Sequence, residues 1–276
     1  MRKISINTTD FSYLNWTERW PYLKSRGFKH LEVATEWSQN ETVLGAIKNR
    51  EITVSAAHEW FHFFTPNDAA GIEQMQRRLI ENIERTRQLR TDKLIWYTGA
   101  NDTYKGKKAV DELLRRLEPV LVKAQELNIT LLLETEFSQG EDPGASVKLL
   151  KKLFTDAKTP FLACNFDAAN LYVAGEEPFP YAYEELRPWI QYVHVKDVRR
   201  FVPGVHSDES VKGWPQIGKV NAVCCAAGEG AVNHCGIFDA LKKDGYDGYL
   251  SIELHMKREY QDETLTKALA FLDKYW

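Results

Sequence analysis

The chain has 276 residues, 43% hydrophobic and 27% charged, with a formal net charge of −3 and an isoelectric point near 6.2. This composition is ordinary for a soluble globular protein, and the lack of a long basic run argues against a dedicated nucleic-acid binder. No segment approaches the ~20 apolar residues of a membrane span or the apolar core of a signal peptide. The four cysteines lack both zinc-site spacing and the density of a secreted scaffold, so we expect a reduced, cytoplasmic protein.

The hydrophobic pattern predicts alternating strands and helices along the chain. Strands are expected at 3–7, 30–34, 51–58, 93–98, 129–134, 160–167, 190–197 and 249–253. Helices are expected at 15–26, 40–49, 67–90, 107–127, 144–156, 234–243 and 262–275, and residues 198–230 are expected to form a long loop. Such alternation requires parallel strands with crossover helices. Eight strands in this length predict one α/β domain over residues 1–276, a closed (β/α)8 TIM barrel.

Four successive predicted strands end in side chains that can bind a cation. They are Glu134, Asp167, His194 and Glu253. A lone glutamate at a strand end is often a solvated rim residue, but the carboxyl ends of barrel strands meet at one face, so we expect these four to converge. Three carboxylates and one imidazole suit Mn²⁺, Mg²⁺ or Co²⁺, with Zn²⁺ as an alternative.

Other side chains near these strand ends are candidate substrate contacts. They are His58, Lys196, Arg199, Arg200, His206 and Trp96. Alternation along the strand puts Lys196 on the same side as His194, and Asp197 on the other side, where we expect it to orient a neighbour. Trp96 can offer an aromatic wall to a sugar, although buried tryptophans belong mostly to the core. The arginines can hold substrate oxygens.

These residues lie in motifs that resemble those of the xylose isomerase-like barrels, also called the sugar phosphate isomerase/epimerase superfamily. The motifs are Leu-Leu-Leu-Glu134, Asn-Phe-Asp167, Val-His194-Val-Lys-Asp197, Gly228-Glu-Gly230 and Gly245-Tyr-Asp-Gly-Tyr-Leu-Ser-Ile-Glu253. The resemblance covers essentially the whole chain. It implies one catalytic divalent metal held by Glu134, Asp167, His194 and Glu253. In the ketose epimerase branch, it also implies that the two glutamates exchange protons with the substrate.

One position departs from the family pattern. Members usually have a histidine three residues after the aspartate of the sixth strand, whereas this chain has Asn170. Asparagine can hydrogen-bond a substrate hydroxyl but does not titrate near neutrality, which weakens an ordinary epimerase assignment. The missing histidine, and the reversed order of His206-Ser-Asp208 relative to an Asp-x-His motif, argue against the apurinic endonuclease branch.

The sequence therefore predicts a metal-dependent isomerase or epimerase of a small sugar, keto-sugar or related polyol, acting through an enediolate. Glu134 and Glu253 are the predicted catalytic residues, and Mn²⁺ is the favoured ion. The predicted substrate contacts are His58, Asn170, Lys196, Arg200 and Trp96. The alternatives are a metal-dependent dehydratase acting on an inosose or keto-sugar, and a non-catalytic sugar-binding barrel. We expect no nucleic-acid or membrane partner, and a homodimer or homotetramer is the alternative to a monomer.

Overall fold

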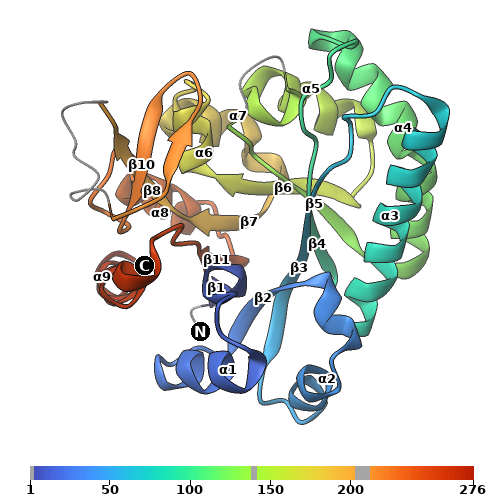
Figure 1. Ribbon diagram of the computed structural model, residues 1–276. Coiled ribbons are helices and arrows are strands. Elements are labelled where there is room, and N and C mark those ends of the chain that lie inside the picture. The colour runs from blue at the N-terminus through green and yellow to red at the C-terminus, as the bar shows by residue number, and fades with distance from the viewer. Residues whose placement is uncertain (1–2, 138–141, 203–211) are drawn as a thin grey trace.

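The strands close into a parallel barrel surrounded by helices (Figure 1). The computed structural model describes residues 3–137, 142–202 and 212–276. The barrel strands are β1 (Ile4–Asn7), β2 (His30–Ala34), β3 (Thr53–His62), β4 (Lys93–Tyr97), β5 (Thr130–Glu134), β6 (Leu162–Asp167), β7 (Ile190–Val195) and β11 (Tyr249–Ile252). Their order around the barrel is β1-β11-β7-β6-β5-β4-β3-β2, and β1 pairs in parallel with both β11 and β2. The predicted (β/α)8 fold is confirmed.

Each predicted helix is present. The long helices are α1 (Trp16–Ser25), α2 (Glu41–Lys48), α3 (Ala69–Gln88), α4 (Gly106–Leu127), α5 (Val147–Ala157), α8 (His234–Lys243) and α9 (Gln261–Tyr275). Two short helices, α6 (Ala168–Val173) and α7 (Tyr183–Leu186), lie between β6 and β7, where no helix was predicted. They are too short to show the 3.6-residue periodicity of a longer helix. Among the described helices, none combines the length and hydrophobicity that crossing a membrane would need.

The prediction of a long loop at 198–230 is wrong. This region contributes to a second, antiparallel sheet of three strands, β8 (Asp197–Arg200), β10 (Asn221–Cys225) and β9 (Pro215–Ile217), in the order β8-β10-β9. Strands of three to five residues leave little periodic signal, so composition alone suggested a loop. His206 lies outside the described residues.

Strand alternation divides the core into two layers. On β5, Leu131 and Leu133 pack in the large core between the barrel and its helices, whereas Leu132 packs in a separate small cluster within the barrel. That inner cluster comprises Ala56, Ile95, Tyr97, Leu132, Ala163 and Tyr192. Glu134, two residues after Leu132, therefore also faces the barrel interior. The same alternation brings Asp167 and His194 inward, where they are paired across the β6–β7 register.

Asp197 anchors the chain where β7 leads into the antiparallel sheet. Its Oδ1 accepts hydrogen bonds from the backbone N–H groups of Val198 (2.9 Å) and Val232 (3.1 Å). Its Oδ2 accepts from those of Gly228 (2.9 Å) and Gly230 (3.0 Å). A Cβ atom on Gly230 would lie 2.1 Å from Asp197 Oδ1, so glycine is required for this close approach. The predicted orienting role of Asp197 matches these contacts.

We expect Asp197→Ala to lower the free energy of unfolding by about 2–3 kcal/mol, because it leaves several buried N–H groups without their acceptor. Asp197→Asn retains the size and one acceptor oxygen, so its loss should be smaller. Urea unfolding of the two variants beside the parent protein measures the difference. Equal stability of all three proteins would contradict the anchoring role.

Candidate active site

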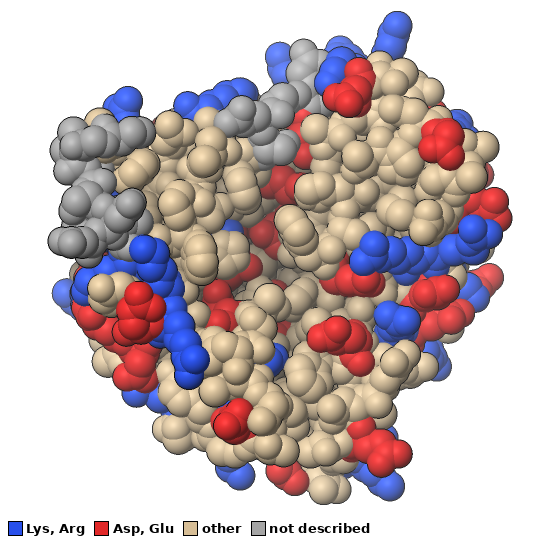
Figure 2. All heavy atoms as spheres, in the orientation of Figure 1, with Lys and Arg blue, Asp and Glu red and all other residues tan. Residues whose placement is uncertain are grey.

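Four side chains from successive barrel strands converge in the interior. Glu134, Asp167, His194 and Glu253 each offer one ligand atom, and these atoms lie within 4.8 Å of one another. Nδ1 of His194 is 3.4 Å from Glu134 Oε2, 3.7 Å from Asp167 Oδ2 and 3.6 Å from Glu253 Oε2. Metal–ligand bonds of about 2.0–2.2 Å place neighbouring donor atoms roughly 3–4 Å apart. Figure 2 shows a hollow near the middle of the molecule with Asp and Glu side chains along it.

The charges of these side chains also fit a divalent cation. Glu134, Asp167 and Glu253 are buried, and a fourth carboxylate, that of Glu32, is 0% exposed beside them. The side chains within this group that can carry positive charge include Lys196, His194 and His255, which contacts Glu253. Nζ of Lys196 lies 2.9 Å from Asp167 Oδ2 and 2.8 Å from Glu253 Oε2. A histidine that binds a metal does so in its neutral form, so the four carboxylates leave excess negative charge, which a bound dication would neutralise.

The pKa values of Glu134 and Glu253 are displaced in opposite directions. Burial raises the pKa of Glu134, which accepts hydrogen bonds from the neutral amides of Asn165 (3.1 Å) and Asn170 (3.0 Å). Burial acts in the same direction on Glu253, but Lys196 and neighbouring histidines outweigh it and hold the pKa of Glu253 well below its usual range. Glu253 is therefore a carboxylate under conditions in which Glu134 more readily holds a proton.

Three of the predicted substrate contacts lie in or beside this cluster. Lys196 bridges two of its carboxylates, and Asn170 is held against Glu134. His58 is buried on β3, and its Nε2 lies 3.0 Å from Thr9 Oγ1. Burial lowers the pKa of His58, so its imidazole is neutral and can both donate and accept a hydrogen bond.

The other two predicted contacts lie elsewhere. Trp96 is 0% exposed in the core outside the barrel, where its ring packs edge-on against Phe63 at 5.7 Å between centroids. Strand alternation turns Tyr97, rather than Trp96, toward the interior, so the prediction for Trp96 is wrong. Arg200 is exposed at the end of β8, paired with Ala222 of β10, because the chain turns away from the barrel there.

Several polar residues of the site were not assigned from the sequence. Asn7 donates a hydrogen bond to Glu253 Oε1 (2.9 Å), and His255 Nε2 lies 3.5 Å from the same oxygen. Asp10 accepts hydrogen bonds from the backbone N–H of His255 (3.0 Å), which fixes the segment after β11. Asn7 and Glu32 occupy inward positions on the first two strands, so extending the period-two argument to those strands would have found them.

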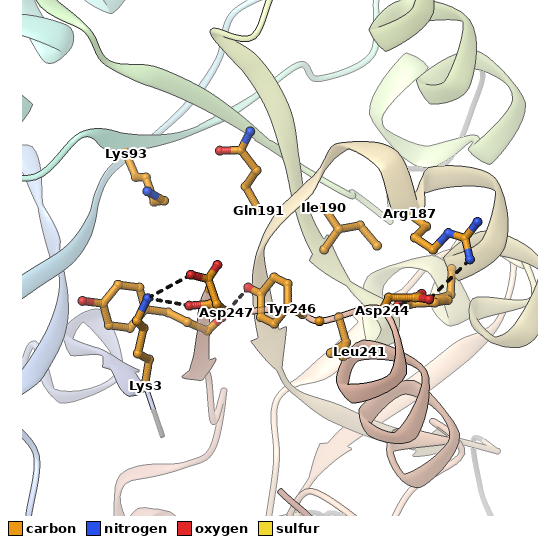
Figure 3. Close-up of a pocket in the computed structure, with 13 residues that line it drawn as sticks. Lys3, Lys93, Arg187, Ile190, Gln191, Leu241, Asp244, Tyr246 and Asp247 are labelled. Carbon is orange, nitrogen blue, oxygen red and sulfur yellow. Dashed lines mark hydrogen bonds and ion pairs between the residues drawn. The ribbon is translucent and has the colours of Figure 1, made fainter. Parts of the chain in front are cut away.

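A large surface cavity lies at the opposite end of the barrel (Figure 3). Its volume is about 490 Å³, and it opens beside residues at the starts of β1, β4, β7 and β11. Two pairs of the charged groups drawn there contact one another: Lys3 Nζ lies 3.8 Å from Asp247 Oδ2, and Arg187 Nη1 lies 3.5 Å from Asp244 Oδ1. Active sites of such barrels form at the carboxyl ends of the strands, so this cavity is not the candidate site.

Known proteins with similar sequences and folds include sugar-processing enzymes. Residues 20–275 match the family described as xylose isomerase-like TIM barrel. An inosose dehydratase from Lacticaseibacillus casei is 25% identical over 145 residues, which are 52% of this chain and 46% of the relative, so the match spans about half of that protein. The solved IolI protein with a bound zinc atom has a TM-score of 0.78 at 15% identity, covering 99% of both chains. The 3-keto-D-glucoside 4-epimerase from E. coli has a TM-score of 0.75 at 14% identity, covering 99% of this chain and all of the other.

A second pair of carboxyl groups lies beyond β4 and β5. Oε1 of Glu136 is 2.9 Å from Thr98 Oγ1, and Oδ1 of Asp142 is 2.5 Å from the same hydroxyl oxygen. A hydroxyl has one proton, so it can donate to only one of these oxygens, and the other contact requires a protonated carboxyl group. Burial and the nearby charge of Asp142 raise the pKa of Glu136 well above its usual range. Glu136 therefore holds its proton to a higher pH in the folded chain than in the unfolded chain.

Because the folded state holds this proton more tightly than the unfolded chain does, the stabilisation is fully present below the ordinary glutamate pKa of 4.5 and is lost as pH rises through the raised value. We expect Glu136→Gln, which cannot ionise, to gain stability relative to the parent protein progressively as the pH rises above 4.5. Unfolding midpoints across that range measure the gain, with Glu41→Gln, an exposed helix position, as the control. Parallel pH profiles for Glu136→Gln and the parent would contradict the raised pKa of Glu136.

Proposed function

Because the chain belongs to the xylose isomerase-like TIM barrel family, we propose that it is a divalent-metal-dependent isomerase or epimerase of a small sugar, keto-sugar or related polyol. The observation that carries this proposal is the buried convergence of Glu134, Asp167, His194 and Glu253, whose ligand atoms lie within 4.8 Å of one another. Its two glutamates lie in unequal surroundings, because Lys196 contacts Glu253 whereas neutral amides contact Glu134. Two carboxyl groups of unequal proton affinity can act as the base and the acid of one reaction.

The donor set suits a resident divalent ion. Glu134, Asp167, His194 and Glu253 would hold it. Such an ion supplies Lewis-acid stabilisation of negative charge on a substrate oxygen. We propose Mn²⁺ because three of the four donors are carboxylates, with Zn²⁺ as the alternative.

The chain's own residues would move the proton. The carboxylate of Glu253 accepts the proton from the carbon next to the substrate carbonyl, and the electrons of that C–H bond move to form an enediolate. The protonated Glu134 returns a proton to the opposite face of the same carbon in an epimerisation. In an isomerisation it returns the proton to the neighbouring carbon, and the hydroxyl proton of the enediolate passes to its other oxygen, so that the carbonyl group moves by one carbon. Glu253 is then protonated and Glu134 ionised, so proton exchange with solvent restores the starting state.

Two further side chains would orient the substrate. Oδ1 of Asn170 is buried and has no hydrogen-bond partner among the described residues, although the amide nitrogen is held by Glu134 Oε1 (3.0 Å) and by Thr135 O (2.9 Å). The fixed orientation of this free acceptor supports a contact with a substrate hydroxyl. The neutral His58 can hydrogen-bond a second hydroxyl.

A dehydratase is the second candidate, because the curated relatives include inosose dehydratases. The first step is the same proton abstraction by Glu253. The enediolate then expels the β-hydroxyl group, which takes the proton of Glu134 and leaves as water. A non-catalytic sugar-binding barrel would use neither glutamate for proton transfer.

We expect Glu253→Gln to lower kcat by about 10²–10⁴-fold on any active member of a panel of keto-sugars and inososes assayed with Mn²⁺, because the amide cannot accept the proton. The parent protein in D₂O should place deuterium on the carbon next to the carbonyl, detected by NMR. Full activity of Glu253→Gln would overturn the assigned role. Metal content of the variant is measured in parallel, because Glu253 is also an expected ligand.

Product mass separates the two enzyme classes. Isomerisation or epimerisation leaves the mass of the substrate unchanged, whereas dehydration removes one water. We expect an unchanged mass by mass spectrometry of the panel reactions. Loss of one water would favour the dehydratase, and binding of a sugar without turnover in the presence or absence of metal would favour the binding barrel.

A further inference from the structure

Glu32 places a fourth carboxylate deep inside the barrel, in addition to the three predicted to bind the metal. It comes from β2, which is separated from β7 in the barrel by β1 and β11. Its side chain is 0% exposed. Oε2 lies 3.0 Å from His194 Nε2 and accepts a hydrogen bond from Ser251 Oγ (2.8 Å), and Oε1 has no hydrogen-bond partner in the described part of the chain. Burying a carboxylate with so few hydrogen-bond partners lowers the free energy of unfolding, so its contact with His194 indicates a role other than stabilising the fold.

The two ring nitrogens of His194 face different surroundings. Nδ1 lies between 3.4 and 3.7 Å from an oxygen of Glu134, Asp167 and Glu253, as expected for a ligand nitrogen directed into the cation site. Nε2 is directed toward Glu32. The amide nitrogen of Asn165 lies 3.4 Å from Nδ1 and 3.2 Å from Nε2, so it does not distinguish the two nitrogens. Glu32 does distinguish them, because its ion-pair contact is with Nε2.

A neutral histidine carries its proton on one nitrogen, and the nitrogen without the proton is the one that can bind a metal. A carboxylate beside Nε2 favours the tautomer with the proton on Nε2 and the lone pair on Nδ1. We propose that Glu32 is a positioning residue of the metal centre, which holds His194 in this tautomer and ring orientation through the Nε2–H···Oε2 hydrogen bond. Ser251 in turn holds Oε2 of Glu32 in place.

This inference rests on the proposed metal centre, and its test is metal binding by the whole protein rather than turnover. Carboxylate partners of ligand histidines typically contribute 10–100-fold to metal affinity. We therefore expect Glu32→Ala to weaken Mn²⁺ and Zn²⁺ binding, measured by calorimetry on metal-stripped protein, by about 10–100-fold. Glu32→Gln, which keeps the shape and one acceptor oxygen, should show a smaller loss. Glu36→Gln is the matched control, since Glu36 lies four residues away in the chain and is exposed.

A spectroscopic measurement separates positioning from general structural support. NMR spectroscopy of Zn²⁺-loaded protein labelled with ¹⁵N-histidine reports the tautomer of each histidine. The resonances of His194 are assigned by their absence from the spectrum of His194→Gln. In the parent protein we expect them to show a protonated Nε2 and a metal-bound Nδ1. Glutamine has the same side-chain shape as glutamate, so we expect Glu32→Gln to fold. Loss of the Nε2–H signal in that variant, or a mixture of the two His194 tautomers, supports the proposal. An unchanged tautomer and unchanged metal affinity in both Glu32 variants would overturn it.

Metal binding by the parent protein and by the Glu32 variants distinguishes an error in the proposed metal centre from an error in the role of Glu32. A parent protein that binds neither Mn²⁺ nor Zn²⁺ at the cluster overturns the metal centre and the role of Glu32 together. A parent protein that binds one ion, with Glu32 variants that bind it equally well, overturns the role of Glu32 alone. Should Glu32→Ala fail to fold by circular dichroism, Glu32→Gln and Ser251→Ala supply the affinity comparison.

Discussion

The arrangement of this site depends on one electrostatic constraint, which is that four carboxyl groups share the interior of one barrel. Glu32, Glu134, Asp167 and Glu253 are all buried, and charges of the same sign at such distances repel strongly in a medium of low polarity. Lys196 bridges Asp167 and Glu253, and the remaining negative charge matches a dication. The repulsion among these carboxylates opposes folding of the strand ends, and the same excess negative charge gives the site its capacity to hold a metal ion.

The two glutamates of this cluster lie in unequal surroundings. Lys196 stabilises the ionised form of Glu253, whereas the amide of Asn170 contacts Glu134 without adding positive charge. Asn170 occupies the position where the family pattern has a histidine, and its buried contact with Glu134 shows what the asparagine does here. It donates a hydrogen bond to Glu134, and its buried amide oxygen has no hydrogen-bond partner among the described residues.

The position of Lys196 depends on structure outside the barrel. The next residue, Asp197, accepts backbone hydrogen bonds from the segment around Gly228 and Gly230. Nε2 of His234, at the start of α8, lies 3.1 Å from the carbonyl oxygen of Lys196. These hydrogen bonds fix the backbone at the end of β7, from which the flexible side chain of Lys196 extends. The pair Gly228 and Gly230, first noted as a motif, is thus explained by its approach to Asp197.

The sequence by itself determined the barrel, because hydrophobic periodicity is local and survives without knowledge of partners. It also predicted that Glu134, Asp167, His194 and Glu253 would converge, since strand ends of a parallel barrel meet at one face. Only the tertiary structure decided which side chains join them. Trp96 was excluded because its side chain points outward from β4 into the core around the barrel. The antiparallel sheet was missed because its strands are only three to five residues long. The contact between Glu32 and His194 crosses the barrel between residues 162 positions apart, and no local pattern specifies such a distance.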